Sequence, residues 1–214
     1  MTSRPRVTIR FEARLSHARW GPLFHVFRLE QPDVRLDWKA GGHPTRERSL
    51  LDGADVGLFL EPPHEPGLVG VTIDTSPMVV IVAAGDPLAH HAGVRVADIL
   101  DRPFPGSPSL NPEWTSFWTL NEQRGSPPEL TDDDVETAED ALDVVATGRA
   151  IATAPASVAI GLAHPGVIAL PLRDGPQVRT RLLWRAGDDN PIIDSLVDLA
   201  TAWTRESRDD RTPP

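Results

Sequence analysis

The sequence contains no cysteine, and Lys39 is the only lysine among its 21 basic residues. The lack of cysteine excludes a disulfide framework, a cysteine-ligated zinc site and thiol chemistry. No stretch approaches 18 apolar residues, so no membrane span is predicted. The N-terminus also lacks the uninterrupted apolar core of a secretory signal. These absences favour a protein of the cytoplasm.

The net charge of the 214-residue chain is −10 at pH 7. Nucleic-acid phosphates are bound by clustered lysine and arginine. The acidic balance therefore argues against direct contact of this chain with DNA. A hydrophobic content of 40% is sufficient for one large domain or two small lobes.

Common catalytic and metal-binding motifs are missing. None of the seven histidines forms an HExxH pair, and the adjacent His90 and His91 face apart, which favours exposed loop residues over chelation. Gly106-Ser107 is flanked by prolines and lacks the GxSxG frame of a serine hydrolase. No GxGxxG or P-loop occurs. We therefore predict no catalytic residue, no metal ligand and no cofactor.

An acidic run and an aromatic cluster could each suggest a ligand site, but a structural role explains each of them better. Asp132 to Asp134 lack the glycine and terminal glutamate of a calcium loop, so a solvated acidic rim is the better interpretation. Trp114, Phe117 and Trp118 follow mostly helical spacing, which is more typical of core or interface than of ligand stacking.

Strands alternate with helices along the chain, which predicts an α/β fold with largely parallel sheets. We expect strands at 7–11, 34–38, 54–60, 78–84, 150–154, 167–170 and 178–185. A first helix should begin within 18–21 and end at Gln31, with further helical segments at 45–53, 96–100, 112–123, 137–147 and 192–204. Residues 205–214 are predicted to be disordered.

The most strongly patterned stretch spans residues 137–159. Thr137 and Asp140 resemble a capping box, Gly148 suits the end of the helix, and Pro155 suits the first turn of a following helix. Such helix starts can bind small polar molecules through backbone N–H groups. The same kind of junction recurs along the chain at Ser16, Thr45, Ser107, Ser109, Thr137 and Ser157. Each alone reads as a helix cap, but together they favour a cleft that binds without catalysis.

Five stretches in order resemble the effector-binding domain of LysR-type transcriptional regulators, over residues 6 to about 203. They read VTIRFEA with GPLFHVFRLEQPDVRLDW, then SLLDGADVGLFL, then PMVVIVAAGDPLAHHAGVRVADILDRPF, then ETAEDALDVVATGRAIATAPASVA, and finally GVIALPLRDG with RTRLLWRAGDDNPIIDSLVDLA. Asp86 stands where the family commonly has histidine.

The resemblance implies a type II periplasmic-binding-protein-like fold, with two Rossmann-like lobes joined by two crossover strands. Lobe I would comprise residues 1–82 and 173–214, and lobe II residues 83–172. A small-molecule effector would bind between the lobes, and lobe closure would change the dimer contacts. Carried over from the family, the effector-binding residues would be Ser16, Thr45, Ser107, Ser109, Thr137 and Pro155.

The family also implies partners. Its members begin with a helix-turn-helix that this sequence lacks, so DNA would be contacted only through a domain absent here. A homodimer or tetramer is expected, with the helices near 20–29 and 114–123 as candidate interfaces.

Two other functions remain open. The first is a stand-alone solute-binding protein of the same fold, which the missing export signal and lipid-attachment cysteine disfavour. The second is an enzyme on a related two-lobe fold. For the effector of a LysR-type domain, the acidic neighbours Asp132 to Asp134, Glu136 and Glu139 weaken the expectation of an anion.

Overall fold

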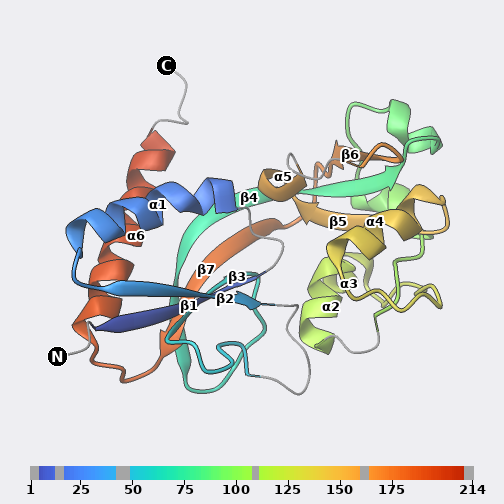
Figure 1. Ribbon diagram of the computed structural model, residues 1–214. Helices are drawn as coiled ribbons and strands as arrows, with labels where there is room; N and C mark the ends of the chain where they lie inside the picture. The colour runs from blue at the N-terminus through green and yellow to red at the C-terminus, as the bar shows by residue number, and fades with distance from the viewer. Residues whose placement is uncertain (1–4, 13–16, 42–48, 108–110, 160–163, 210–214) are drawn as a thin grey trace. The chain divides into compact units, whose positions relative to one another are not determined.

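A computed structural model describes residues 5–12, 17–41, 49–107, 111–159 and 164–209 (Figure 1). The chain forms two compact units. Unit 1 comprises Met1–Gly42, Arg48–Thr75 and Arg179–Pro214, and unit 2 comprises His43–Glu47 and Ser76–Val178. Unit 2 begins earlier and ends later in the sequence than the predicted lobe II, and the predicted lobe boundaries remain a prediction.

The sheet of unit 1 combines parallel and antiparallel strands. Strands β1 (Arg6–Glu12), β2 (Arg35–Gly41) and β3 (Val56–Leu60) run parallel, with β1 in the middle. Strand β7 (Gln177–Arg185) then pairs antiparallel with β3. The expectation of largely parallel sheets therefore holds for the first three strands and is wrong for the return strand.

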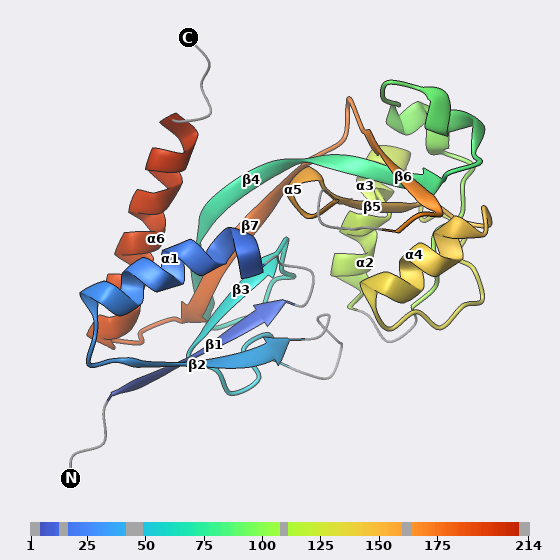
Figure 2. The ribbon, with the colours of Figure 1, turned by 45° about the horizontal axis from the view of Figure 1, so that its top comes forward.

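Helix α1 (His17–Glu30) covers one face of this sheet next to helix α6 (Figure 2). Its apolar stripe is buried, as the helical spacing predicts, and consists of Trp20, Leu23, Phe24 and Phe27. Pro22 lies inside the helix on the exposed side, slightly further from the start than predicted. The aromatic side chains of α1 are thus explained by core packing.

The opposite face of the unit 1 sheet is covered by residues 49–55, which form bends and turns. The prediction of a helix over 45–53 is wrong for residues 49–53, while Thr45 and its neighbours up to 48 lie outside the described residues. Leu50 and Leu51 pack on Phe59 and Leu183. The segment therefore contributes to the core without forming a helix.

Charged side chains replace the hydrogen bonds that a helix would have made in this segment. Arg10 Nη1 donates to the carbonyls of Ser49, at 3.0 Å, and Leu50, at 2.5 Å. Lys39 donates to the carbonyl of Asp52, and Arg185 to that of Ala54 at 2.9 Å. Buried carbonyls must be paired. In a helix the backbone N–H groups would pair them, whereas here cationic side chains from three strands do so and thereby stabilise the loop.

Strand β4 (Leu68–Ala83) is twice as long as the sequence suggests and runs from unit 1 into unit 2. The prediction that it begins at Met78 is wrong, because Gly70 and Pro77 weaken the local strand pattern. In unit 1, Arg181 Nη2 donates to the Gly70 carbonyl at 3.1 Å. A Cβ at Gly70 would lie 2.4 Å from the Leu182 carbonyl oxygen, so the close approach to β7 requires glycine.

Unit 2 is built on β4, which pairs antiparallel with β5 (Ala152–Pro155) on one side and β6 (Val167–Pro171) on the other. Its core includes Val79 and Ile81 of β4, Leu142 and Val145 of helix α4 (Ala138–Ala146), and Ala154. The short helix α5 (Ala156–Ala159) follows β5 directly. The expected parallel pairing is thus wrong for these three strands.

The predicted helix over 112–123 is divided in two. Helix α2 (Pro112–Trp118) ends before Leu120, which has a φ of 61° and no exposed surface, and α3 (Asn121–Arg124) follows. Leu120 adopts a left-handed conformation that costs a non-glycine residue energy, and its full burial offsets that cost. Trp114 and Trp118 are buried, which confirms the core interpretation for these two aromatics.

Helix α6 (Pro191–Asp209) closes unit 1 and is longer than the predicted 192–204. Its buried stripe consists of Ile193, Leu196, Ala200 and Thr204. Thr204 Oγ1 donates to the Ile73 carbonyl at 2.5 Å, which attaches the helix to β4. The helix continues to Asp209, within the segment predicted to be disordered, and residues 210–214 lie outside the described ones.

Two 3₁₀-helices, η1 (Pro87–His90) and η2 (Val96–Ile99), follow β4 in unit 2. Asp86 caps η1 through a 2.9 Å hydrogen bond from the Leu88 N–H, and it pairs with Arg102 at 2.5 Å. Burial by itself raises the pKa of this carboxyl. The Arg102 guanidinium and the Leu88 N–H outweigh burial and hold the pKa below its usual value.

Asp86 is expected to make unit 2 acid-sensitive. A lowered pKa in the folded state contributes stability above the ordinary value of 3.8, and that stability is lost as the pH falls through the folded pKa. Asp86→Asn should reduce the free energy of unfolding by about 1–2 kcal/mol at pH 7 and flatten its fall below pH ~4. Urea unfolding between pH 3 and 7 measures both effects.

Asp37→Asn is the matched control, because Asp37 pairs only with the well-exposed Arg6 and Arg35 among the ion pairs recorded for it. Exposed pairs contribute about 0–1 kcal/mol. An equal loss in the two variants would contradict the assigned role of Asp86.

Candidate functional site

Three of the six predicted effector-binding residues can be placed. Ser107, Thr137 and Pro155 lie in unit 2. Ser16, Thr45 and Ser109 lie outside the described residues. The candidate site is therefore described from its unit 2 residues.

Ser107 lies at the end of a ribbon in which residues 103–107 run beside 129–135. Phe104 N–H donates to the Glu129 carbonyl, and Thr131 N–H donates to the Phe104 carbonyl, both at 2.9 Å. Ser107 Oγ then donates to the Val135 carbonyl at 2.6 Å. The structure thus brings Ser107 to within two residues of Thr137, although 30 positions separate them in sequence.

Gly106 makes this ribbon possible. Its carbonyl accepts from the Val135 N–H at 3.1 Å, and its own N–H donates to Thr131 Oγ1 at 3.3 Å. A Cβ at this position would lie 2.2 Å from the Thr131 carbonyl oxygen, well inside van der Waals contact. The Gly106-Ser107 pair therefore has a packing role, and its glycine positions the serine.

Thr137 is the N-cap of α4, as predicted. Its Oγ1 accepts from the Asp140 N–H at 3.1 Å, and its own N–H donates to Asp140 Oδ2 at 2.8 Å. The Thr137 hydroxyl and N–H lower the pKa of the Asp140 carboxyl. The capping box is confirmed, and Gly148 follows the helix with a φ of 79°, as expected of a terminating glycine.

Pro155 is the last residue of β5, where it pairs with Met78 of β4. The prediction that it forms the first turn of a helix is wrong by one residue, since α5 begins at Ala156. The N–H of Ser157 donates to Ser76 Oγ at 3.1 Å. This hydrogen bond ties the start of α5 to β4 within unit 2.

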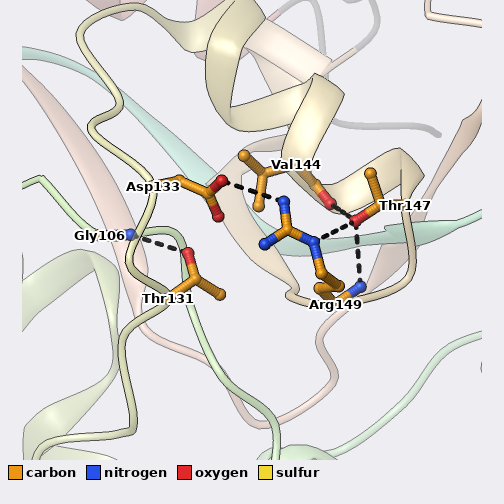
Figure 3. A network of polar contacts seen from close by, with 6 residues as sticks. All are labelled: Gly106, Thr131, Asp133, Val144, Thr147 and Arg149. Carbon is orange, nitrogen blue, oxygen red and sulfur yellow. Dashed lines mark hydrogen bonds and ion pairs between the residues drawn. The ribbon is translucent and has the colours of Figure 1, made fainter.

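A brace next to the ribbon was missed by sequence reasoning (Figure 3). The Arg149 guanidinium faces Asp133, with Nη2 to Oδ1 at 3.0 Å, and Nε donates to Thr147 Oγ1 at 3.2 Å. Thr147 in turn donates to the Val144 carbonyl at 2.6 Å. The brace joins the end of α4 to the acidic loop, and it was missed because Asp133 and Arg149 lie 16 residues apart.

Hydrogen bonds also lower the pKa of the Asp133 carboxyl. Arg149 and the Thr131 hydroxyl hold the pKa of this carboxyl below its usual value. Its neighbours Asp132 and Asp134 are exposed, as predicted for a solvated rim. Within the described ranges, no group of three histidine, aspartate or glutamate side chains is arranged to hold a metal ion.

The described helices were compared with the requirements for a membrane-spanning helix. Across the described segments, no helix combines the length and the apolar character needed to cross a bilayer.

The LysR substrate binding domain family matches residues 2–205. The chain belongs to this family. The sequence-based resemblance to LysR-type regulators is therefore confirmed, over nearly the whole chain. The family is one of regulatory binding domains.

Solved structures confirm the type II periplasmic-binding-protein-like fold of this LysR substrate binding domain. The BenM effector binding domain with its effector benzoate has a TM-score of 0.75 at 20% identity, covering 100% of this chain and 97% of that one. The effector binding domain of QuiR in complex with shikimate also gives 0.75, at 17% identity, with coverages of 95% and 99%. Full-length CbnR complexed with its target DNA gives 0.69 at 20% identity, covering 94% of this chain and 71% of that one. A search of curated proteins found no sequence match to this chain.

Proposed function

We propose that the protein is the effector-sensing domain of a LysR-family transcriptional regulator. The family match over residues 2–205 is the observation that carries this function. The BenM and QuiR domains, which share the fold, are bound to small molecules. The effector contacts would include Ser107, Thr137 and Pro155, together with Ser16, Thr45 and Ser109.

The protein would bind its effector without transforming it. The polar groups at the candidate positions of unit 2 serve as caps and loop contacts: Ser107 Oγ donates to a backbone carbonyl, and Thr137 caps a helix. Neither is paired with the general base that an activated nucleophile needs. This arrangement supports a regulatory rather than a catalytic role.

The partners and the cellular location of the protein are inferred from its family. We propose a homodimer or tetramer, with DNA contacted through a helix-turn-helix domain outside these 214 residues, and a cytoplasmic location. Full-length CbnR bound to DNA, of which this chain spans 71%, supports such an assembly. We further propose that the two compact units correspond to the two lobes of the family. Binding of the effector would close the lobes, and this closure would change the dimer contacts.

A ligand screen tests the function. Thermal unfolding of the protein with a broad metabolite library should show at least one compound that raises Tm in a concentration-dependent way, because a ligand that binds only the folded state stabilises it. Ser107→Ala should weaken the response to that compound about tenfold, the effect of one lost hydrogen bond. Ser126→Ala, at an exposed loop position, is the control and should leave it unchanged. A library without any stabilising compound would contradict the proposal.

A further inference from the structure

Strand β7 enters unit 1 at Arg179, where a carboxylate of unit 1 holds it. Val178 is the last residue of unit 2 on this strand, and Arg179 is the first residue of unit 1. The Arg179 guanidinium contacts both carboxylate oxygens of Glu61, with Nε 3.0 Å from Oε1 and Nη2 2.9 Å from Oε2. Because two such bonds fix the guanidinium plane, the pair has a defined orientation.

The same carboxylate also completes the hydrogen-bond ladder between β3 and β7. Leu60 and Thr180 are the last paired residues of these strands. One step further, the Glu61 N–H donates to the Arg179 carbonyl at 2.9 Å. The Arg179 N–H donates to Glu61 Oε1 at 2.5 Å, where a regular strand would use the Glu61 carbonyl. One side chain therefore holds both the backbone and the side chain of Arg179.

Glu61 holds Arg179 from an unfavourable conformation. Its side chain is 6% exposed, whereas that of Arg179 is 58% exposed. Its φ of 36° makes it one of three non-glycine residues in the described segments with a left-handed backbone, a conformation that costs energy. Removing a carboxylate from water costs further energy and offsets much of what the ion pair contributes. This combination indicates a role in positioning more than a role in stability.

The other strand that joins the units, β4, is held in the unit that it enters. Thr75 is the last residue of unit 1 on this strand, and Ser76 is the first of unit 2. Ser76 is buried, and its Oγ accepts a hydrogen bond from the N–H of Ser157 in unit 2 at 3.1 Å. Each crossover strand is thus tied to the unit that it enters at its first residue there.

We propose that Glu61 is a positioning residue of the hinge between the two units. It fixes β7 to unit 1 from Arg179 onwards, so that movement of the units bends the chain before Arg179, at residues 175–178. Gly175 and Pro176 lie in neither a helix nor a strand, so bending there breaks no ladder. This inference rests on the proposed function, in which the effector closes the lobes.

Spin labels can measure this movement, because the chain has no cysteine of its own. Asp33→Cys in unit 1 and Ser126→Cys in unit 2 supply two exposed label sites. Double electron–electron resonance then gives the distribution of distances between the labels in the protein without effector. Arg179→Met removes the guanidinium, and Glu61→Gly removes the carboxylate at a φ that glycine accepts without strain. Each variant should broaden the distance distribution, because the bend is no longer confined to residues 175–178.

Arg181→Met is the matched control. It makes the same change on the same strand, further inside unit 1, where Arg181 Nη2 donates to the Gly70 carbonyl at 3.1 Å. It should lower the free energy of unfolding in urea without broadening the distance distribution. If Arg179→Met lowers stability and leaves the distribution as narrow as Arg181→Met does, the pair serves stability alone and the inference is overturned.

Hydrogen exchange followed by NMR tests the contact itself. The Arg179 amide should exchange about tenfold faster in Glu61→Gly, the effect of one lost hydrogen bond. Unchanged exchange would overturn the inference, because the carboxylate would then not hold the strand. None of these measurements uses an effector. Their failure would leave the effector-sensing function standing, whereas a metabolite library without any stabilising compound would overturn that function and leave the measured distances unaffected.

Discussion

Replacing Gly106 with alanine is expected to destabilise unit 2 by about 2–3 kcal/mol, because the new methyl group would lie 2.2 Å from the Thr131 carbonyl oxygen. The neighbouring atoms are backbone, so they can move only if the ribbon of residues 103–107 and 129–135 is distorted. Urea unfolding should show the loss, and Tm should fall by roughly 4–10 °C for a chain of this size.

Gly85→Ala is the matched control for Gly106→Ala. Gly85 also lies in unit 2, and a Cβ there would contact nothing within 4 Å. Its stability should stay within about 0.5 kcal/mol of the unmodified protein. If Gly106→Ala proves as stable as Gly85→Ala, the close packing assigned to the ribbon is wrong.

Replacing Arg10 with leucine is expected to destabilise unit 1 by about 3 kcal/mol. Arg10 is 5% exposed, and its Nη1 satisfies the carbonyls of Ser49 and Leu50. Leucine would leave both carbonyls unpaired, at about 1–3 kcal/mol for each buried group. The contact of the guanidinium with the Phe59 ring, 5.8 Å from its centroid, would be lost as well.

Hydrogen exchange distinguishes the local effect of Arg10→Leu from a general one. The amide of Leu51 and that of Ala54, which donates to the Leu51 carbonyl, should exchange faster if the segment detaches. Arg35→Leu, on the exposed edge strand β2, makes the same change at a surface ion pair and should cost less than about 1 kcal/mol. Unchanged protection of residues 49–55 in Arg10→Leu would show that the arginine does not hold this segment.

Features that depend on residues close together in the sequence could be predicted. Thr137 and Asp140 are three residues apart, so the capping box and the start of α4 were visible in the sequence, as was the stop at Gly148. The buried stripe of α1 follows from helical spacing in the same way. The order of several such local patterns also led to the correct family.

Features that depend on distant partners could not be predicted. Residues 49–53 read as the end of a helix, but Arg10, 40 positions away from Leu50, pairs the carbonyls of Ser49 and Leu50 and makes a loop stable. Glu61 has a φ of 36° and accepts hydrogen bonds from Arg179, 118 positions away, and that pairing raises the pKa of Arg179. No local pattern specifies either contact.

The sequence by itself thus determined the α/β class, the family and the capped helix beside the candidate site. Only the tertiary structure decided how the polar groups of that site are used. Ser107 reads as an available donor because a sequence shows which groups can form hydrogen bonds. Its partner, a carbonyl 28 positions away, became visible only in the fold. A buried or half-buried donor bonds to the acceptor that the packing provides, and only the fold shows which acceptor that is.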